Sequence, residues 1–143
     1  MKFYRTGSAE WSGGIRDGKG SISTESGALN HYPYGFNSRF EDKPGSNPEE
    51  LLGAAHAACF TMALSVALGQ AKLIAEKMET SAKVTLEHIE GAYVITAVHL
   101  TLKAKVPGTD QATLETIAAG AKAGCPVSKV LKAEIMLDAQ LVN

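Results

Sequence analysis

Hydrophobic and polar positions divide the chain into segments of different period, and the longest apolar segment, residues 51–71, carries no charge. Asn47 before it is a good N-cap, Pro48 suits the first helical position, and Glu50 completes a pattern similar to a capping box. These signals predict a helix from Pro48 to about Lys72. Because this helix has almost no polar face, one small domain covers it poorly, and the pattern predicts a partner subunit.

Glycine-containing turn sequences separate short segments in the first part of the chain. Gly, Pro, Asn and Asp favour turns because they tolerate or preset the backbone angles that turns require. The spacing predicts a meander of short strands. Its turns are expected at Trp11–Gly14, Asp17–Gly20 and Tyr32–Gly35.

Alternation within the next segment, FNSRF, predicts a further strand. Successive side chains of a strand point to opposite faces, which places Phe36, Ser38 and Phe40 on one side. Asn37 and Arg39 then lie on the other side. We therefore expect Arg39 to point away from the face that the two Phe residues pack.

Three later segments alternate between apolar and polar residues, at 82–86, 94–102 and 135–141. Alternation of this kind predicts half-buried antiparallel strands. Together with the helices, these strands predict a single α+β domain over residues 1–143, with antiparallel sheets packed on the long central buried helix. A length of 143 residues also suits one domain.

Two shorter helices are predicted between the last two alternating segments. The first begins near Thr109 or Asp110, which can cap it, and ends at Gly124. Pro126 suits the first position of the second, PVSKVLK. The apolar stripe of the first comprises Leu114, Ile117, Ala118 and Ala121.

The charge of the chain disfavours polyanionic partners. Fourteen basic and fifteen acidic residues, without a run of either sign, provide no basic patch for nucleic acid or an acidic membrane. The N-terminus lacks the apolar segment and cleavage site of a signal peptide, so we expect a cytoplasmic location. Residues 51–71 are long enough to cross a bilayer, but their many Ala, Gly and Ser residues favour a buried helix instead of a membrane span.

Cys59 shares a broad side of the long helix with Glu49 and His56, since their spacing keeps them within about a 100° arc. Free Cys is among the most buried residue types, so core packing is one interpretation of Cys59. In a partly dry interface, however, neighbouring charges shift pKa values strongly, and Cys59 could then be reactive. One interpretation of His56 is that it polarises the site, and the one that we favour is a packing residue with one hydrogen bond. No pair of histidines has the spacing of metal ligands.

Cys125 follows a helix-ending Gly and precedes Pro126 at the start of the short third helix. Unpaired backbone N–H groups and the helix dipole at such a position favour a thiolate. The alternative is an incidental residue at a helix start. The two cysteines form neither a CxxC motif nor the disulfide framework of a secreted protein.

Three motifs together resemble a known family: STESGALNHYPYGFNSRFE, NPEELLGAAHAACF and AGCPVSKVLKAEI. They are similar to the osmotically inducible protein C (OsmC) branch of the superfamily that also contains the organic hydroperoxide resistance proteins. The resemblance extends from Trp11 to Leu141. It implies the fold of that family, an intertwined homodimer with active sites at the subunit interface, and a cysteine-based peroxidase.

The resemblance also implies roles for individual residues. Cys59 matches the peroxidatic cysteine, Cys125 the resolving cysteine, and Glu49 the family's glutamate. We expect Arg39 to be the catalytic arginine, whereas the hydroperoxide resistance branch uses an arginine from an earlier turn, where this chain has Arg16. Arg39 would stabilise the thiolate, hold the peroxide and pair with Glu49.

The implied reaction reduces organic hydroperoxides, and hydrogen peroxide less efficiently, in defence against peroxide and osmotic stress. Cys59 would become a sulfenic acid and then form a disulfide with Cys125. An external dithiol, which the resemblance implies is dihydrolipoamide on lipoylated proteins, would reopen that bond. The resemblance implies no metal and no bound organic cofactor.

Two other functions remain open at the level of the sequence. A general thiol–disulfide exchanger would react with protein disulfides, although the missing CxxC motif counts against it. A non-catalytic dimeric stress protein or small-molecule-binding protein would carry incidental thiols. In that case the substitution Cys59→Ser would leave its function intact.

Overall fold

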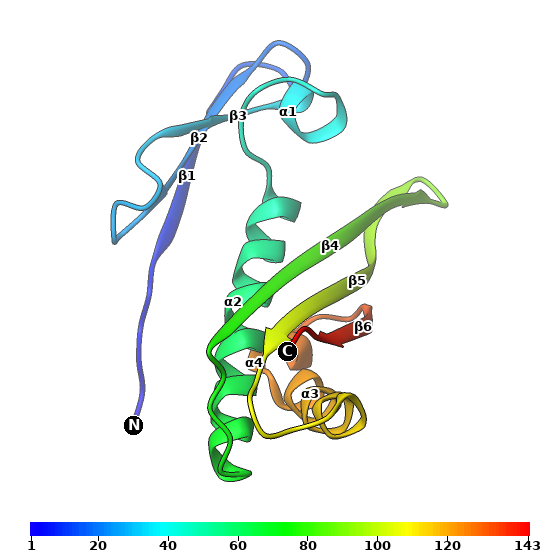
Figure 1. The fold of residues 1–143 in the computed structure, drawn as a ribbon. Helices are drawn as coiled ribbons and strands as arrows, with labels where there is room; N and C mark the ends of the chain where they lie inside the picture. Colours follow the sequence, from blue (N-terminus) through cyan, green and yellow to red (C-terminus); the bar gives the residue numbers. More distant parts are fainter. The chain divides into compact units, whose positions relative to one another are not determined.

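The computed structural model of the chain describes residues 1–143, which form two compact units, residues 1–51 and 52–143 (Figure 1). The long helix α2, Pro48–Gln70, begins in the first unit and continues through the second. It ends within two residues of the predicted Lys72. Each unit has its own three-stranded sheet. The chain for which the sequence predicted one domain thus forms two compact units.

The N-terminal unit contains an antiparallel sheet in the order β1-β2-β3, which confirms the predicted meander. The segment YPYG, predicted to be a turn, instead contains the strand β3. Gly20 is required where the rings of Trp11 and Tyr34, from the two neighbouring strands, meet beside it, because a Cβ there would lie 2.5 Å from the ring of Tyr34 and 2.7 Å from that of Trp11. The strands are β1 (Gly7–Ser12), β2 (Lys19–Thr24) and β3 (Tyr32–Tyr34).

The segment FNSRF forms a short helix, α1 (Phe36–Phe40), so the predicted strand is wrong. Over five residues the first and last positions share a face in either conformation, and alternation cannot distinguish a strand from a single helical turn. The rings of Phe36 and Phe40 lie 5.0 Å apart on this turn. The Ser38 hydroxyl stabilises it by accepting a hydrogen bond from the Gly35 N–H at 3.0 Å and by donating to the Ser46 carbonyl at 2.7 Å.

The sheet of the C-terminal unit has the order β4-β5-β6 and is mixed. β4 and β5 are antiparallel, as predicted, but β5 and β6 are parallel, so the prediction of three antiparallel strands is wrong for β6. Two helices connect β5 to β6, and a helical crossover is the usual way to bring the next strand back in the same direction. The strands are β4 (Lys77–Ile89), β5 (Ala92–Lys105) and β6 (Glu134–Leu141).

The two crossover helices begin where the sequence predicted. α3 (Gln111–Gly124) is capped by Asp110, whose carboxylate accepts a hydrogen bond from the Thr113 N–H at 2.8 Å. α4 (Pro126–Val130) has Pro126 in its first turn and is shorter than the predicted PVSKVLK segment. The turn between the two helices places Cys125 at the end of one and at the start of the other.

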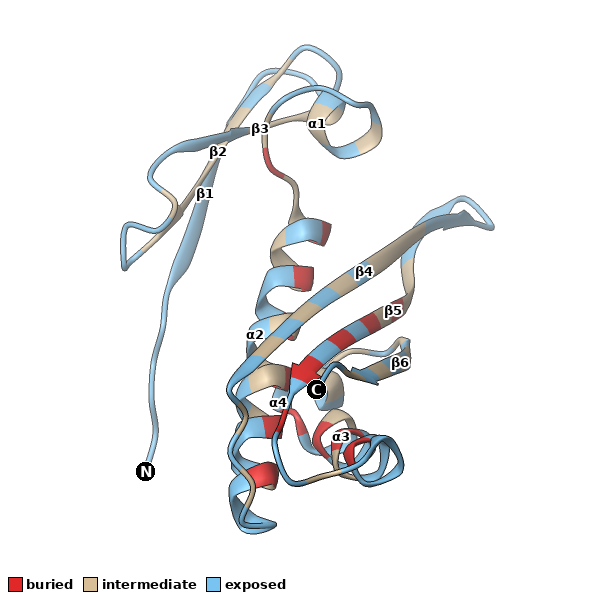
Figure 2. Ribbon diagram, viewed as in Figure 1, coloured by how far each residue is buried: buried red, intermediate tan, exposed pale blue.

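The core of the C-terminal unit lies between one face of α2, the strand β5 and α3 (Figure 2). Burial of apolar side chains removes them from water and is the main favourable contribution to folding. Cys125 belongs to this core and is completely buried. The fully or almost fully buried side chains include Phe60, Leu64 and Leu68 of α2, Val98, Leu100 and Leu102 of β5, and Leu114 and Ala118 of α3.

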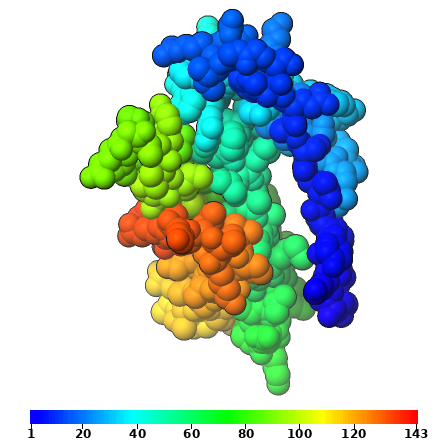
Figure 3. Space-filling model, turned by 180° about the vertical axis from the view of Figure 1, so that it is seen from behind, coloured from blue at the N-terminus to red at the C-terminus, as the bar shows by residue number.

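The opposite face of α2 is not covered within the chain. Met62 is 74% exposed and Val66 is 62% exposed. The space-filling view from behind shows residues of α2, in green, at the surface of the C-terminal unit (Figure 3). By length and mean hydropathy α2 also meets the requirement for a membrane span, a criterion that core helices of soluble proteins meet as well.

Candidate active site

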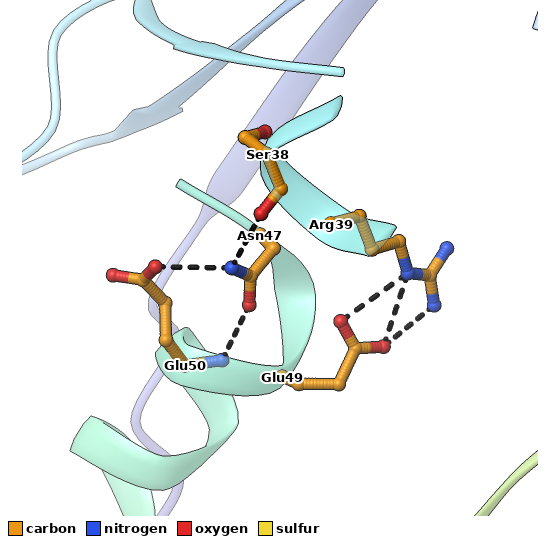
Figure 4. Close-up of polar contacts among 5 residues, drawn as sticks. All are labelled: Ser38, Arg39, Asn47, Glu49 and Glu50. Atoms are coloured by element: carbon orange, nitrogen blue, oxygen red, sulfur yellow. Dashed lines mark hydrogen bonds and ion pairs between the residues drawn. The ribbon is translucent and has the colours of Figure 1, made fainter. Parts of the chain in front are cut away.

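Arg39 and Glu49 form an ion pair in the N-terminal unit (Figure 4). The Arg39 Nη2 donates to Glu49 Oε1 at 2.6 Å, and Nε lies 3.2 Å from each carboxylate oxygen. A guanidinium fork matches a carboxylate in this way, with both charge and geometry satisfied. The structure thus contains the pairing that the sequence motifs implied. The Glu49 side chain is 11% exposed and that of Arg39 36%, so the cation remains accessible.

The neighbouring Glu50 has a different role, as predicted. Its backbone N–H donates to Asn47 Oδ1 at 2.8 Å, and the Asn47 Nδ2 donates to Glu50 Oε1 at 3.1 Å (Figure 4). These two bonds form a reciprocal cap at the start of α2. The Asn47 Nδ2 also donates to the Ser38 carbonyl at 3.1 Å, which ties the helix start to α1 and thereby helps to place Arg39 beside Glu49.

The C-terminal unit brings the two cysteines together. Both thiols are free, Cys59 is partly buried on α2, and Cys125 is fully buried at the junction of α3 and α4. Cys59 packs against the core that contains Cys125, and hydrogen bonding between the two thiols is among the causes that shift the pKa of each. The fold thus brings the two cysteines close together, and the sequence alone could not establish this.

The environment of Cys125 favours its thiolate. Burial by itself raises the pKa of Cys125, but hydrogen bonds from the Cys59 thiol, the Ser128 hydroxyl and the backbone N–H groups of Val127 and Ser128 lower the pKa on balance. Backbone N–H groups at a helix start stabilise a thiolate in this way. The direction agrees with the expectation for a cysteine before Pro126.

The environment of Cys59 has the opposite effect. Burial raises the pKa of the Cys59 thiol, and its hydrogen bond to Cys125 raises the pKa further, while the Val127 N–H lowers it. No cation is among the groups that shift this pKa. Of the two thiols of the C-terminal unit, Cys125 thus has the lower pKa. The expected Cys59 thiolate requires an additional positive charge.

His56 and Ser128 adjoin the cysteines. His56 is completely buried, its Nε2 lies 2.7 Å from the Ser128 Oγ, and its Nδ1 has no partner. The predicted single hydrogen bond of His56 is confirmed. The sequence analysis missed Ser128, although its position three residues after Cys125, in the first turn of α4, was a signal that it could reach the same thiol.

Both arginines lie over a phenylalanine ring, but the ion pair described above belongs to Arg39. The guanidinium of Arg39 is 5.3 Å from the Phe40 centroid, and that of Arg16, the alternative catalytic arginine, is 4.5 Å from the Phe36 centroid. Arg16 also borders a cavity of about 460 Å³ in the N-terminal unit, together with Lys19 and Lys43.

Nowhere in the chain is a group of three or more His, Cys, Asp or Glu side chains placed to bind a metal ion.

Comparison with known proteins identifies the family of this chain. The family model described as "OsmC-like protein" matches residues 40–140. The chain is 54% identical to the Peroxiredoxin OsmC of Escherichia coli over 141 residues, which covers 99% of both proteins. It is 34% identical to the organic hydroperoxide resistance protein of Xanthomonas axonopodis pv. citri, over 64% of this chain and 63% of that protein.

Solved structures agree with this result. The organic hydroperoxide resistance protein OhrB of Bacillus subtilis superposes with a TM-score of 0.72 at 25% identity, over 96% of this chain and 98% of that one. An OsmC-like protein from Mycoplasma pneumoniae has the same fold, with a TM-score of 0.76 at 13% identity and complete coverage of both chains. The resemblance noted in the sequence is therefore confirmed: the chain belongs to the OsmC-like family and is an enzyme of the peroxidase type.

Proposed function

We propose that this protein reduces organic hydroperoxides to alcohols, with Cys59 as the peroxidatic and Cys125 as the resolving cysteine. The observation that carries the proposal is the packing of Cys59 against the core that contains Cys125, where each thiol shifts the pKa of the other. Two cysteines that lie close together can form a disulfide with little movement of the backbone. The names of the relatives support peroxide as the substrate class.

The proposed reaction has two steps. The Cys59 thiolate attacks the terminal oxygen of the hydroperoxide, the O–O bond breaks, and the alkoxide takes up a proton to leave as an alcohol. Cys59 is then a sulfenic acid. The Cys125 thiolate attacks its sulfur, an S–S bond forms, the S–O bond breaks, and the hydroxide leaves as water after taking up a proton.

Arg39 is the proposed source of the positive charge that Cys59 lacks in the C-terminal unit. A cation near a cysteine lowers its pKa, and a guanidinium can also bind the two peroxide oxygens and the developing alkoxide charge. The ion pair with Glu49 supports this role, because a carboxylate holds the fork of Arg39 in one orientation. Arg39, Glu49, Cys59 and Cys125 are therefore the proposed catalytic residues.

The proposed partners follow from the same chemistry. A disulfide between Cys59 and Cys125 must be reduced by an external dithiol, for which dihydrolipoamide on a lipoylated protein is our proposal. The exposed apolar side chains of Met62 and Val66 support a homodimer that covers this face of α2. No bound cofactor enters the proposed reaction. We further propose that the protein acts in the cytoplasm.

A turnover assay with an alkyl hydroperoxide and hydrogen peroxide, each with a dithiol, tests the proposal. Cys59→Ser should abolish consumption of both peroxides. Cys125→Ser should allow one turnover and leave a sulfenic acid that a dimedone-type probe traps. Faster turnover of the alkyl hydroperoxide is expected for the wild type. The proposal fails if the wild type consumes peroxide no faster than the dithiol alone does.

A further inference from the structure

We propose that His56 and Ser128 are positioning residues that act on Cys125 through a hydrogen-bonded relay and prepare it for disulfide formation. The relay runs from the His56 imidazole to the Ser128 hydroxyl and from there to the Cys125 sulfur. This inference rests on the proposed function for the reaction step that the relay accelerates. The hydrogen bonds of the relay do not depend on that function.

The relay joins two helices that are distant in sequence. His56 lies on α2 and Ser128 on α4, 72 residues apart, and their Nε2 and Oγ atoms are separated by 2.7 Å. Ser128 is the third residue of α4, whose N-cap is Cys125, so its hydroxyl lies on the side of the helix start where Cys125 is, and it is among the groups that lower the pKa of Cys125. His56 and Cys125 are both fully buried, and a hydrogen bond is electrostatically stronger in such surroundings than in water.

The donors of the relay follow from the number of available hydrogens. Burial lowers the pKa of His56, so its imidazole is neutral near pH 7 and carries one N–H. Ser128 has one O–H, which the Cys125 thiolate accepts. The Ser128 oxygen must then accept the N–H of His56 Nε2.

This arrangement also explains the unpaired nitrogen of His56. With the proton on Nε2, the Nδ1 that lacks a partner is an acceptor with a bare lone pair. The other tautomer would leave a buried N–H without an acceptor, which is rare in folded proteins. The tautomer that satisfies the imidazole best is therefore the one that supports the Cys125 thiolate.

Few titratable groups act on this relay. His56 is itself part of the relay, Cys59 of α2 is the titratable group outside it that shifts the pKa of Cys125, and no carboxylate, ammonium or guanidinium is among the groups that do so. Lys122 of the neighbouring α3 directs its ammonium to the Ile135 carbonyl, 3.2 Å away. Neutral donors and backbone N–H groups thus stabilise the Cys125 thiolate.

The relay would accelerate the second step of the proposed reaction. The Cys125 thiolate is the nucleophile that forms the S–S bond with the Cys59 sulfenic acid, and the rate depends on the fraction of Cys125 that is ionised. The proton that Cys125 loses on ionisation balances the one that the departing hydroxide gains as it becomes water. Formation of the sulfenic acid on Cys59 does not involve the relay.

Substitution of Ser128 tests the relay with little change in volume. In a Cys59→Ser background, where Cys125 is the only thiol, the ultraviolet absorbance of the thiolate reports the pKa of Cys125. We expect Ser128→Ala to raise this pKa, Ser128→Thr to retain the hydroxyl and the lower pKa, and the exposed control Ser81→Ala to have no effect. Equal pKa values in the Ala and Thr variants would overturn the proposal.

A second arm follows one turnover of the protein with both cysteines present. Ser128→Ala should slow disulfide formation about three- to fourfold for each unit by which the pKa of Cys125 rises, because the greater nucleophilicity of the remaining thiolate offsets part of the loss, while sulfenic acid formation on Cys59 should not become slower. Equal slowing of both steps would contradict a role specific to Cys125. If no sulfenic acid forms even in the wild type, the proposed function fails, and the thiol titration still decides whether the relay exists.

His56 is tested with a pair of variants. His56→Gln keeps a donor near the position of Nε2 and should retain the low pKa of Cys125, whereas His56→Leu should raise it. Circular dichroism establishes that each variant folds before its thiol is titrated. A His56→Leu variant that is folded and has an unchanged pKa of Cys125 would remove His56 from the relay and leave Ser128 as the only donor.

Discussion

The Arg39 guanidinium binds the Glu49 carboxylate through contacts of 2.6 and 3.2 Å, and the two residues are ten positions apart in the sequence. α1 supplies the arginine and the first turn of α2 supplies the glutamate. The loop between them is held by the bond from Asn47 to the Ser38 carbonyl. The orientation of the Arg39 guanidinium is therefore set by neighbouring residues.

Substitution of Arg39 should affect peroxidase activity much more than substitution of Arg16. We expect Arg39→Lys to lower kcat/KM for an alkyl hydroperoxide by about 10²–10³, because lysine retains the charge but lacks the fork that orients the peroxide oxygens. The matched variant Arg16→Lys should remain close to the wild type. Steady-state kinetics with an excess of dithiol measures both, and a larger loss for Arg16→Lys would transfer the role to Arg16.

Loss of the cap at the start of α2 should destabilise the protein. Asn47→Ala removes the acceptor of the Glu50 N–H and the donor to the Ser38 carbonyl, and we expect it to cost about 1 kcal/mol or more in the free energy of unfolding. Asn47→Asp keeps the acceptor and should lose less. Urea denaturation measures both variants. An equal loss in the two would show that the bonds donated by the Asn47 Nδ2, to the Ser38 carbonyl and to Glu50, matter and that the acceptor of the Glu50 N–H does not.

His56 should make the stability of the protein depend on pH in mildly acidic solution. Burial lowers the pKa of His56, so below its unfolded pKa of about 6.5 the unfolded chain binds a proton that the folded chain does not. The contribution of His56 is therefore present above that pH and is lost as the pH falls toward the folded pKa.

Urea denaturation at two pH values on either side of 6.5 checks this sign. The free energy of unfolding of the wild type should fall more on acidification than that of His56→Gln, whose side chain does not titrate. The pairing of His99 with Asp138 is exposed and unchanged in both proteins, so it cancels in the comparison. An identical pH dependence in the two proteins would show that the pKa of His56 is the same in the folded and the unfolded wild-type protein.

A charged side chain on the exposed face of α2 should weaken the proposed homodimer. Met62→Lys places an ammonium where the apolar side chain is 74% exposed in the single chain, and burial of an unpaired charge at an interface is costly. Sedimentation velocity should show a lower dimer fraction than for the wild type. The control Gln140→Lys, at an exposed position of β6, should not change it. A dimer that is unaffected by Met62→Lys must use another surface.

Local signals in the sequence were sufficient where the structure depends on one or two turns of chain. Asn47, Asp110 and Pro126 predicted the starts of α2, α3 and α4, since capping needs only residues a few positions apart. The motifs around Cys59 and Cys125 likewise identified the family. The segment FNSRF was too short for its periodicity to distinguish a strand from a helical turn.

Only the tertiary structure decided which distant groups meet. The parallel direction of β6 depends on the path of the connection through α3 and α4, which alternation within the strand does not encode. The contact of His56 with Ser128 requires α4 to pack against α2, and no pattern within either helix specifies it. The sequence by itself therefore determined the helix starts and the family, whereas packing between elements determined which groups surround the Cys125 thiol and lower its pKa.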